Sequence, residues 1–139
     1  MAIAVALLAA GCGCSAAPPL PTGTTNQTLN VGGVGRTYQL TLPASVRQAP
    51  AGSVTLVVGL HGGLGSGSGF ADIAEFPALA QRKGFVFAAP DGRSLPFALG
   101  RSVRSWNAGR CCGPAVTNRV DDVAFITALV NELRGRLPS

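Results

Sequence analysis

The segment that most constrains the fold is the apolar run over residues 53–60, which leads directly into His61-Gly62-Gly63. Its centre, Leu56-Val-Val-Gly-Leu60, predicts a strand covered on both faces, as in the interior of a parallel sheet. The glycines that follow predict a loop whose backbone amides carry little steric cover. The sequence therefore predicts a buried strand with accessible N–H groups at its carboxyl end.

A second continuous apolar run, Phe85–Ala89, predicts another buried strand, and Pro90-Asp91-Gly92 closes it with a turn. Between the two runs, apolar residues from 70 to 80 predict a helix that is interrupted near Pro77 and ended by Gly84. Two strands joined by a helix form a right-handed βαβ unit, so we expect an α/β fold in which these strands are parallel.

Elements on either side extend this unit. Residues 28–31 and 36–42 flank a glycine-rich turn, which predicts an antiparallel hairpin, half exposed to water, that ends at Pro43. Residues 44–52 are expected to be loop, and residues 93–120 a long excursion rich in glycine and arginine. Asp121 and Asp122 open an amphipathic helix. A role at the helix N-terminus is favoured over a role as paired carboxylates in acid–base catalysis, because acidic residues suit a helix N-terminus.

The first residues predict export. Met1–Ala10 is an apolar stretch of signal-peptide length and is too short to span a bilayer. It leads into Gly11-Cys12, which resembles a bacterial lipobox, so Cys12 is the candidate for lipidation, with Cys14 or simple cleavage as alternatives. We expect residues 1–14 to be a leader, 15–26 a Pro/Thr-rich linker and 27–139 one domain, secreted or lipid-anchored at the cell envelope.

The charge of the chain says little about its partners. A formal net charge of +5, from 11 basic and 6 acidic residues, is scattered along the sequence. No basic run is interleaved with aromatic residues, so nothing favours nucleic acid as a partner. Attraction to a polyanionic surface is one explanation, and ordinary surface charge is the favoured one. The 139 residues also fall short of the roughly 200 that a doubly covered α/β sheet needs.

The His-Gly-Gly loop is the strongest candidate for chemistry. Acyl transfer needs backbone N–H donors aimed at the developing oxyanion, and Gly62 and Gly63 fit this requirement. A phosphate-binding loop would need Gly-Lys-Ser/Thr, which is missing, and a plain strand-to-helix turn is the remaining alternative. His61 is expected to fix the loop through backbone hydrogen bonds, because neither a nucleophile nor an orienting group can be paired with it.

The most distinctive string is Trp106-Asn107-Ala-Gly-Arg-Cys111-Cys112-Gly113. A lone tryptophan in a loop is more often packed than used for binding, yet an exposed indole beside Asn107 would suit an aromatic acyl group or a sugar ring. Adjacent thiols without a nearby histidine fall short of a tetrahedral metal site. A vicinal disulfide is rare, so each cysteine is expected to find a partner elsewhere.

Five strings together resemble, in the same order, the secreted polyhydroxybutyrate depolymerase and feruloyl esterase family. They are Arg36-x-Tyr-x-Leu-x-Leu-Pro43, Leu60-His-Gly-Gly63, Gly84-Phe-Val-Phe-Ala-Ala-Pro-Asp-Gly92, Trp106-Asn-Ala-Gly-x-Cys-Cys-Gly113 and Val120-Asp-Asp-Val-x-Phe-Ile126. The resemblance covers residues 36–133. It implies an α/β-hydrolase fold and serine-esterase activity, without a cofactor, on a polyester or a hydroxycinnamoyl-polysaccharide ester.

The resemblance also implies roles for particular residues. Gly63 would lie in the oxyanion hole with Gly62 and Leu64 beside it. Trp106 and Asn107 would lie near the mouth of the active site and contact substrate. One cysteine of the pair Cys111 and Cys112 would bond to a cysteine just past the nucleophile.

Members of that family continue with a Gly-x-Ser-x-Gly elbow, followed by an aspartate and a histidine. This sequence contains no such elbow, and therefore no aspartate and histidine that follow one. We therefore expect the triad beyond Ser139 and no catalytic residue within the chain. The strand over residues 54–60 would lie in the middle of the complete sheet and here keep an unpaired edge, a predicted aggregation site.

The function predicted from the sequence is thus the N-terminal part of an exported serine esterase, inactive by itself. The alternative is a complete, non-catalytic, lipid-anchored module that holds a carbohydrate or polyester surface through the Trp106 loop. In either case we expect contact with a membrane only through the lipid anchor.

Overall fold

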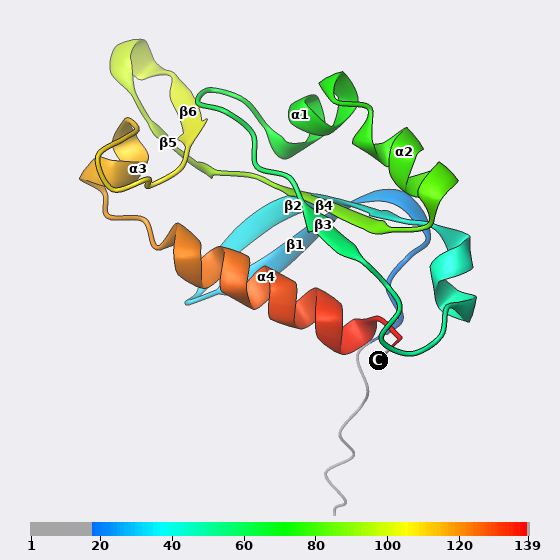
Figure 1. Cartoon of the computed structure of the whole chain (residues 1–139). Helices are drawn as coiled ribbons and strands as arrows, with labels where there is room; N and C mark the ends of the chain where they lie inside the picture. The colour runs from blue at the N-terminus through cyan, green and yellow to red at the C-terminus, as the bar shows by residue number, and fades with distance from the viewer. Residues whose placement is uncertain (1–17, 139) are drawn as a thin grey trace, which may run out of the picture.

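The structure is a computed structural model that describes residues 18–138, and it has mixed α/β architecture in three layers (Figure 1). A four-stranded sheet in the order β1-β2-β4-β3 lies between α4 on one face and α1 with α2 on the other. Its strands are β1 (Gly23–Val31), β2 (Val34–Leu42), β3 (Leu56–Val58) and β4 (Val86–Pro90). The helices that cover it are α1 (Gly67–Ile73), α2 (Phe76–Lys83) and α4 (Asp122–Arg136).

The predicted hairpin is confirmed, and it is longer than expected. β1 and β2 pair antiparallel over their full lengths, from Gly23 opposite Leu42 to Val31 opposite Val34. The linker predicted over 15–26 is corrected in its described part, because β1 already begins at Gly23 and Leu20 is buried in the core. The linker ends earlier than its composition indicates because threonine, which is common in flexible tethers, also favours strands.

The βαβ unit is confirmed as well. β3 and β4 pair in parallel, and the connecting helix is interrupted, as predicted. The break falls at Glu75, whose φ of 54° places it in the left-handed region, and Pro77 lies in the first turn of α2, where proline is tolerated. Gly84 ends α2 in the left-handed conformation.

The strand predicted over 53–60 needs correction. Only Leu56–Val58 is a strand, and its side chains are half-buried. Leu56 packs against the core beneath α4 and Val57 against the core beneath α1 and α2, so apolar side chains do meet both faces. Within the described residues, however, β3 pairs with β4 alone and lies at the edge of the sheet. Because β3 has a partner on one side only, its side chains are incompletely covered.

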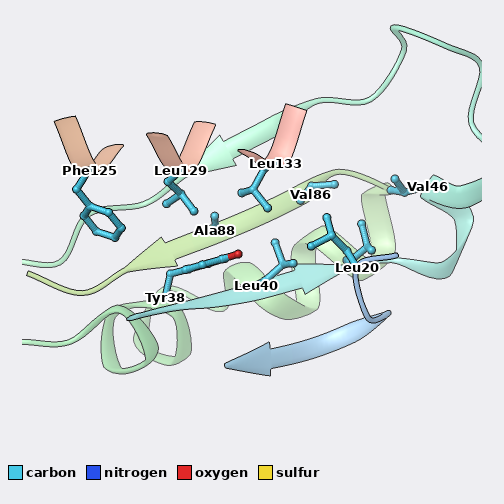
Figure 2. Packing of buried hydrophobic residues seen from close by; sticks show 10 residues of the cluster. Leu20, Tyr38, Leu40, Val46, Val86, Ala88, Phe125, Leu129 and Leu133 are labelled. Carbon is cyan, nitrogen blue, oxygen red and sulfur yellow. The ribbon is translucent and has the colours of Figure 1, made fainter. Parts of the chain in front are cut away.

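The main core lies between the sheet and α4 (Figure 2). Phe125, Leu129 and Leu133 recur every four residues along α4, so they share one face and pack on the sheet. The facing residues of the sheet are Leu40, Leu42, Val86 and Ala88. The amphipathic helix predicted after Asp121 is therefore confirmed.

The remaining segments form local structure that the sequence did not predict. The expected loop over 44–52 contains a 3-10 helix, Ala44–Gln48, which buries Val46. The excursion over 93–120 contains the antiparallel pair β5 (Arg93–Pro96) and β6 (Ser102–Ser105), the 3-10 turn Ala98–Gly100 and the short helix α3 (Pro114–Thr117). No helix in residues 18–138 is long and apolar enough to cross a membrane. The predicted leader and its lipidation candidate, Cys12, lie outside the described residues.

Candidate functional site

The loop between β3 and α1 borders a surface hollow of about 400 Å³. The loop forms one side of this hollow, the side chains of Phe70 and Ile73 from α1 form an apolar wall, and Arg104 from β6 completes the lining. Ile73 is 88% exposed, so this wall is open to a ligand from solvent. The hollow is thus the place where the residues of the His-Gly-Gly loop meet other elements.

Two backbone amides in this loop are free. Within residues 18–138, the N–H groups of Gly62 and Gly63 donate to no acceptor. A Cβ placed on either glycine would meet nothing within 4 Å, so there is open space beside both residues. These amides are the donors that the sequence predicts for a developing oxyanion.

Leu64 does not provide a third donor. Its N–H already donates to the carbonyl oxygen of Arg104 at 2.9 Å. The φ of Leu64 is 66°, and this left-handed turn directs its amide toward β6 rather than toward solvent. The expectation that Leu64 contributes to an oxyanion hole is therefore corrected: this residue anchors the loop.

His61 fixes the loop from within. The ring is 4% exposed, its Nε2 accepts a hydrogen bond from the Gly92 N–H at 2.9 Å, and its Nδ1 lies 2.6 Å from the Gly62 carbonyl oxygen. Because the Gly92 amide can only donate, we assign the proton to Nδ1, which donates to Gly62. Both ring nitrogens are thus engaged with backbone, which confirms the predicted structural role and leaves neither nitrogen to act as a general base.

Trp106 supports the same loop. Its Nε1 donates to the His61 carbonyl oxygen at 2.9 Å, and its ring centroid lies 5.1 Å from that of His61. The indole is half-buried and packs against the main core. The exposed, substrate-binding indole is therefore not what the structure shows, because the polar atom and one face of the ring are already used inside the protein.

Asn107 is equally engaged. Its Nδ2 donates to the Val120 carbonyl oxygen at 2.9 Å, its Oδ1 accepts from the Gly109 N–H at 3.2 Å, and its own N–H donates to Asp122 Oδ2 at 2.7 Å. The side chain shapes the loop after β6 instead of facing the hollow. The predicted role in substrate binding has no support in this geometry.

The sequence did not predict the ion pair between Arg36 and Asp122. The Nη2 atom of Arg36 lies 2.7 Å from Asp122 Oδ1, and both side chains are more than 90% buried. The guanidinium also lies 4.0 Å from the centroid of the Phe125 ring. Arg36 shares its strand face with Tyr38 and Leu40, and this spacing of two residues was the available signal that the arginine points inward.

Asp91 joins the turn after β4 to the site. One carboxylate oxygen accepts from the Gly67 N–H at 2.8 Å, and the other accepts from the Thr37 hydroxyl at 2.6 Å. The Nε atom of Arg104 lies 3.8 Å from this carboxylate. Gly67 approaches so closely that an added Cβ would overlap the carbonyl of Ala89, which explains why glycine begins α1.

The two described cysteines are bonded to each other. Cys111 and Cys112 form a vicinal disulfide across a cis peptide bond, whereas each was expected to pair elsewhere. No other cysteine lies in residues 18–138, so the described chain offers no alternative partner. Among these residues there is also no group of three or more His, Cys, Asp or Glu side chains that could hold a metal ion.

A scan of protein-family models and a search of curated proteins found no match to this chain. Chemically, the site offers two unengaged amide donors on a loop that is fixed by hydrogen bonds, an apolar wall, and Arg104 in the lining. Such an arrangement can polarise or bind an oxygen that carries negative charge.

Proposed function

We propose that this chain is the part of a serine esterase that supplies an oxyanion-hole loop. Within that class, the sequence strings favour an exported enzyme of the polyhydroxybutyrate depolymerase and feruloyl esterase family, acting on hydroxyalkanoate or hydroxycinnamoyl esters. The observation that carries the proposal is the pair of free N–H groups at Gly62 and Gly63, at the carboxyl end of a parallel strand.

The position of the loop supports this proposal. In α/β-hydrolases, one oxyanion donor comes from the loop between the third strand and the first helix, and here the glycines lie between β3 and α1. The loop is also held in place by His61, Trp106 and the Leu64 amide. Donors that are fixed before the reaction stabilise developing charge best, because no reorganisation is needed at the moment of reaction.

The edge of β3 supports it as well. Thr55 accepts from Val86 and Gly59 donates to Ala88, so the alternate residues Leu56 and Val58 direct their N–H and C=O groups away from β4. An apolar hollow of about 540 Å³ lies along this edge, toward α4. In the proposed esterase, the strand that carries the nucleophile would pair with this edge.

The alternative, a binding module that uses the Trp106 loop, is less well supported. The indole N–H and the Asn107 amide, which such a module would need for a sugar or polyester, are both engaged in internal hydrogen bonds. The engaged side chains therefore favour the esterase over the binding module.

The first experiment is to sequence the gene and its transcript past the codon for Ser139, and to assay the whole translated product with p-nitrophenyl butyrate and methyl ferulate. We expect a Gly-x-Ser-x-Gly elbow, then an aspartate and a histidine, together with ester hydrolysis. A stop codon after Ser139, with no elbow in any downstream frame, would show that the esterase proposal is wrong.

A matched pair of variants tests the loop in that product. Gly63→Pro removes the N–H and is expected to lower kcat by about 10²–10³, the effect of losing one oxyanion donor. Gly63→Ala keeps the N–H and meets no neighbour within 4 Å, so a much smaller loss is expected. Equal losses in the two variants would mean that the Gly63 amide does not stabilise the transition state.

A further inference from the structure

The hollow beside the His-Gly-Gly loop contains a second group that favours negative charge. Arg104 is one of the residues that line this hollow, and its side chain is 43% exposed. Within residues 18–138 its nitrogen atoms donate no hydrogen bond, and its one ionic neighbour, Asp91, lies 3.8 Å from Nε. Both oxygens of Asp91 already accept hydrogen bonds, from Gly67 and Thr37. Arg104 is therefore left with donors to offer to a ligand.

The lining of the hollow brings several unengaged donors together. They are the Gly62 and Gly63 amides and the Arg104 guanidinium, and none of the described lining residues is acidic. The Phe70 and Ile73 side chains line the same space. A ligand that matches this pattern has one acceptor oxygen for the amides, a short apolar chain and a second, anionic acceptor for Arg104.

From this arrangement we infer that Arg104 selects esters that carry a free carboxylate at the end of a short aliphatic chain. The ester carbonyl oxygen lies at the amides of Gly62 and Gly63, and the carboxylate pairs with the guanidinium, which suits planar, two-oxygen acceptors. This inference rests on the proposed function, because it takes the loop as the element that receives the ester carbonyl.

The arginine side chain can be changed without releasing the loop. The contact that anchors Leu64 uses the backbone carbonyl of Arg104 and persists in Arg104→Gln. The matched control is Arg101→Gln, which removes the same charge from an exposed arginine at the end of the β5–β6 hairpin, outside the lining of the hollow. The indole N–H signal of Trp106, the only tryptophan of the chain, reports whether the loop is intact in each variant.

The test is a titration of the full chain, followed through the ¹H–¹⁵N signals of Gly62 and Gly63. The probes are monomethyl glutarate, an ester with a carboxylate, and dimethyl glutarate, its neutral counterpart. We expect monomethyl glutarate to shift both glycine signals and to bind about tenfold more weakly to Arg104→Gln, the effect of one charge-assisted hydrogen bond. Arg101→Gln is expected to bind it like the unmodified chain, and dimethyl glutarate is expected to bind all three proteins alike.

Two results would overturn the inference, and they differ in what they leave standing. If both esters shift the glycine signals and Arg104→Gln changes neither affinity, the role of Arg104 is wrong and the oxyanion loop is retained. If neither ester shifts these signals in the unmodified chain, the inference fails together with the proposed role of the loop.

Discussion

At the scale of single residues, the site is held by polar groups that the chain buries and satisfies. Asp122 is the clearest case, because its two oxygens bond to the Arg36 guanidinium and to the Asn107 N–H. One carboxylate thus links β2, the loop after β6 and the start of α4. Removing one partner of such a buried pair leaves the other charge uncompensated.

Asp122→Asn is therefore expected to lower the free energy of unfolding by about 3–5 kcal/mol, measured by urea denaturation. The control is Glu132→Gln, which breaks the partly exposed i,i+4 pair of Glu132 with Arg136 and is expected to cost about 0.3–0.5 kcal/mol. Similar costs for both variants would show that burial adds nothing to the Arg36–Asp122 pair.

Tyr38 gives a second prediction at this scale. Burial raises the pKa of the Tyr38 hydroxyl above 10.0, with Arg136 lowering it and Glu132 raising it to smaller extents. The unfolded chain therefore releases this proton at a lower pH than the folded chain. The contribution to stability is complete below pH 10 and is lost as the pH rises through the folded pKa.

The measurement is an absorbance titration at 295 nm, in which the only tyrosine of the chain is observed alone. We expect its midpoint to lie above 10.0 in the native protein and near 10 in concentrated urea. A Tyr38→Phe variant should lose this part of the pH dependence of unfolding. A native midpoint at or below that in urea would contradict the burial argument.

At the scale of elements, the approach of α1 to β4 positions one wall of the hollow. Gly67 makes this approach possible, because any Cβ would overlap the backbone of Ala89. α1 carries Phe70 and Ile73, so a displaced helix would also move the apolar wall.

Gly67→Ala is expected to destabilise the protein by about 1–3 kcal/mol through overpacking against backbone that cannot yield locally. Gly135→Ala is the matched control, since this exposed position in α4 has nothing within 4 Å and alanine is expected to stabilise the helix by about 0.5–1 kcal/mol. Thermal denaturation followed by circular dichroism measures both. Gly67→Ala as stable as the unmodified chain would show that α1 shifts away without cost.

At the scale of the whole molecule, the two edges of the sheet differ in chemistry. The β1 edge carries mainly threonine, asparagine and glutamine, whereas β3 is Leu-Val-Val beside an apolar hollow. An apolar edge with free backbone groups is a template for pairing with another chain.

We expect the protein to self-associate through β3 as its concentration rises, measured by sedimentation velocity. Thr55→Lys, which places a charge at the exposed position before β3, is expected to reduce this association, because lysine on an edge strand opposes pairing. Thr28→Lys on β1 is the control and should leave association unchanged. An equal effect of the two lysines would place the contact elsewhere.

The sequence predicted those parts of the fold that depend on local spacing. The hairpin, the helix broken before Pro77, the Gly84 stop and the helix after Asp121 each follow from periodicity, capping or turn residues. The loop glycines and the backbone-bonded His61 were also predicted, because a lone histidine without partners has few other roles.

Only the tertiary structure decided which polar groups the fold uses up internally. Trp106, Asn107 and Leu64 were candidates for a binding site. In the folded chain, each of them donates a hydrogen bond to a backbone carbonyl that is distant in the sequence. The Arg36–Asp122 pair spans 86 residues. Its only local signal is the spacing of Arg36 two residues from Tyr38, which places both side chains on the buried face of the strand. Local spacing sets which elements form, because it acts within a few residues along the chain. The state of each donor and acceptor depends on how those elements pack, and only the folded chain brings the partners together.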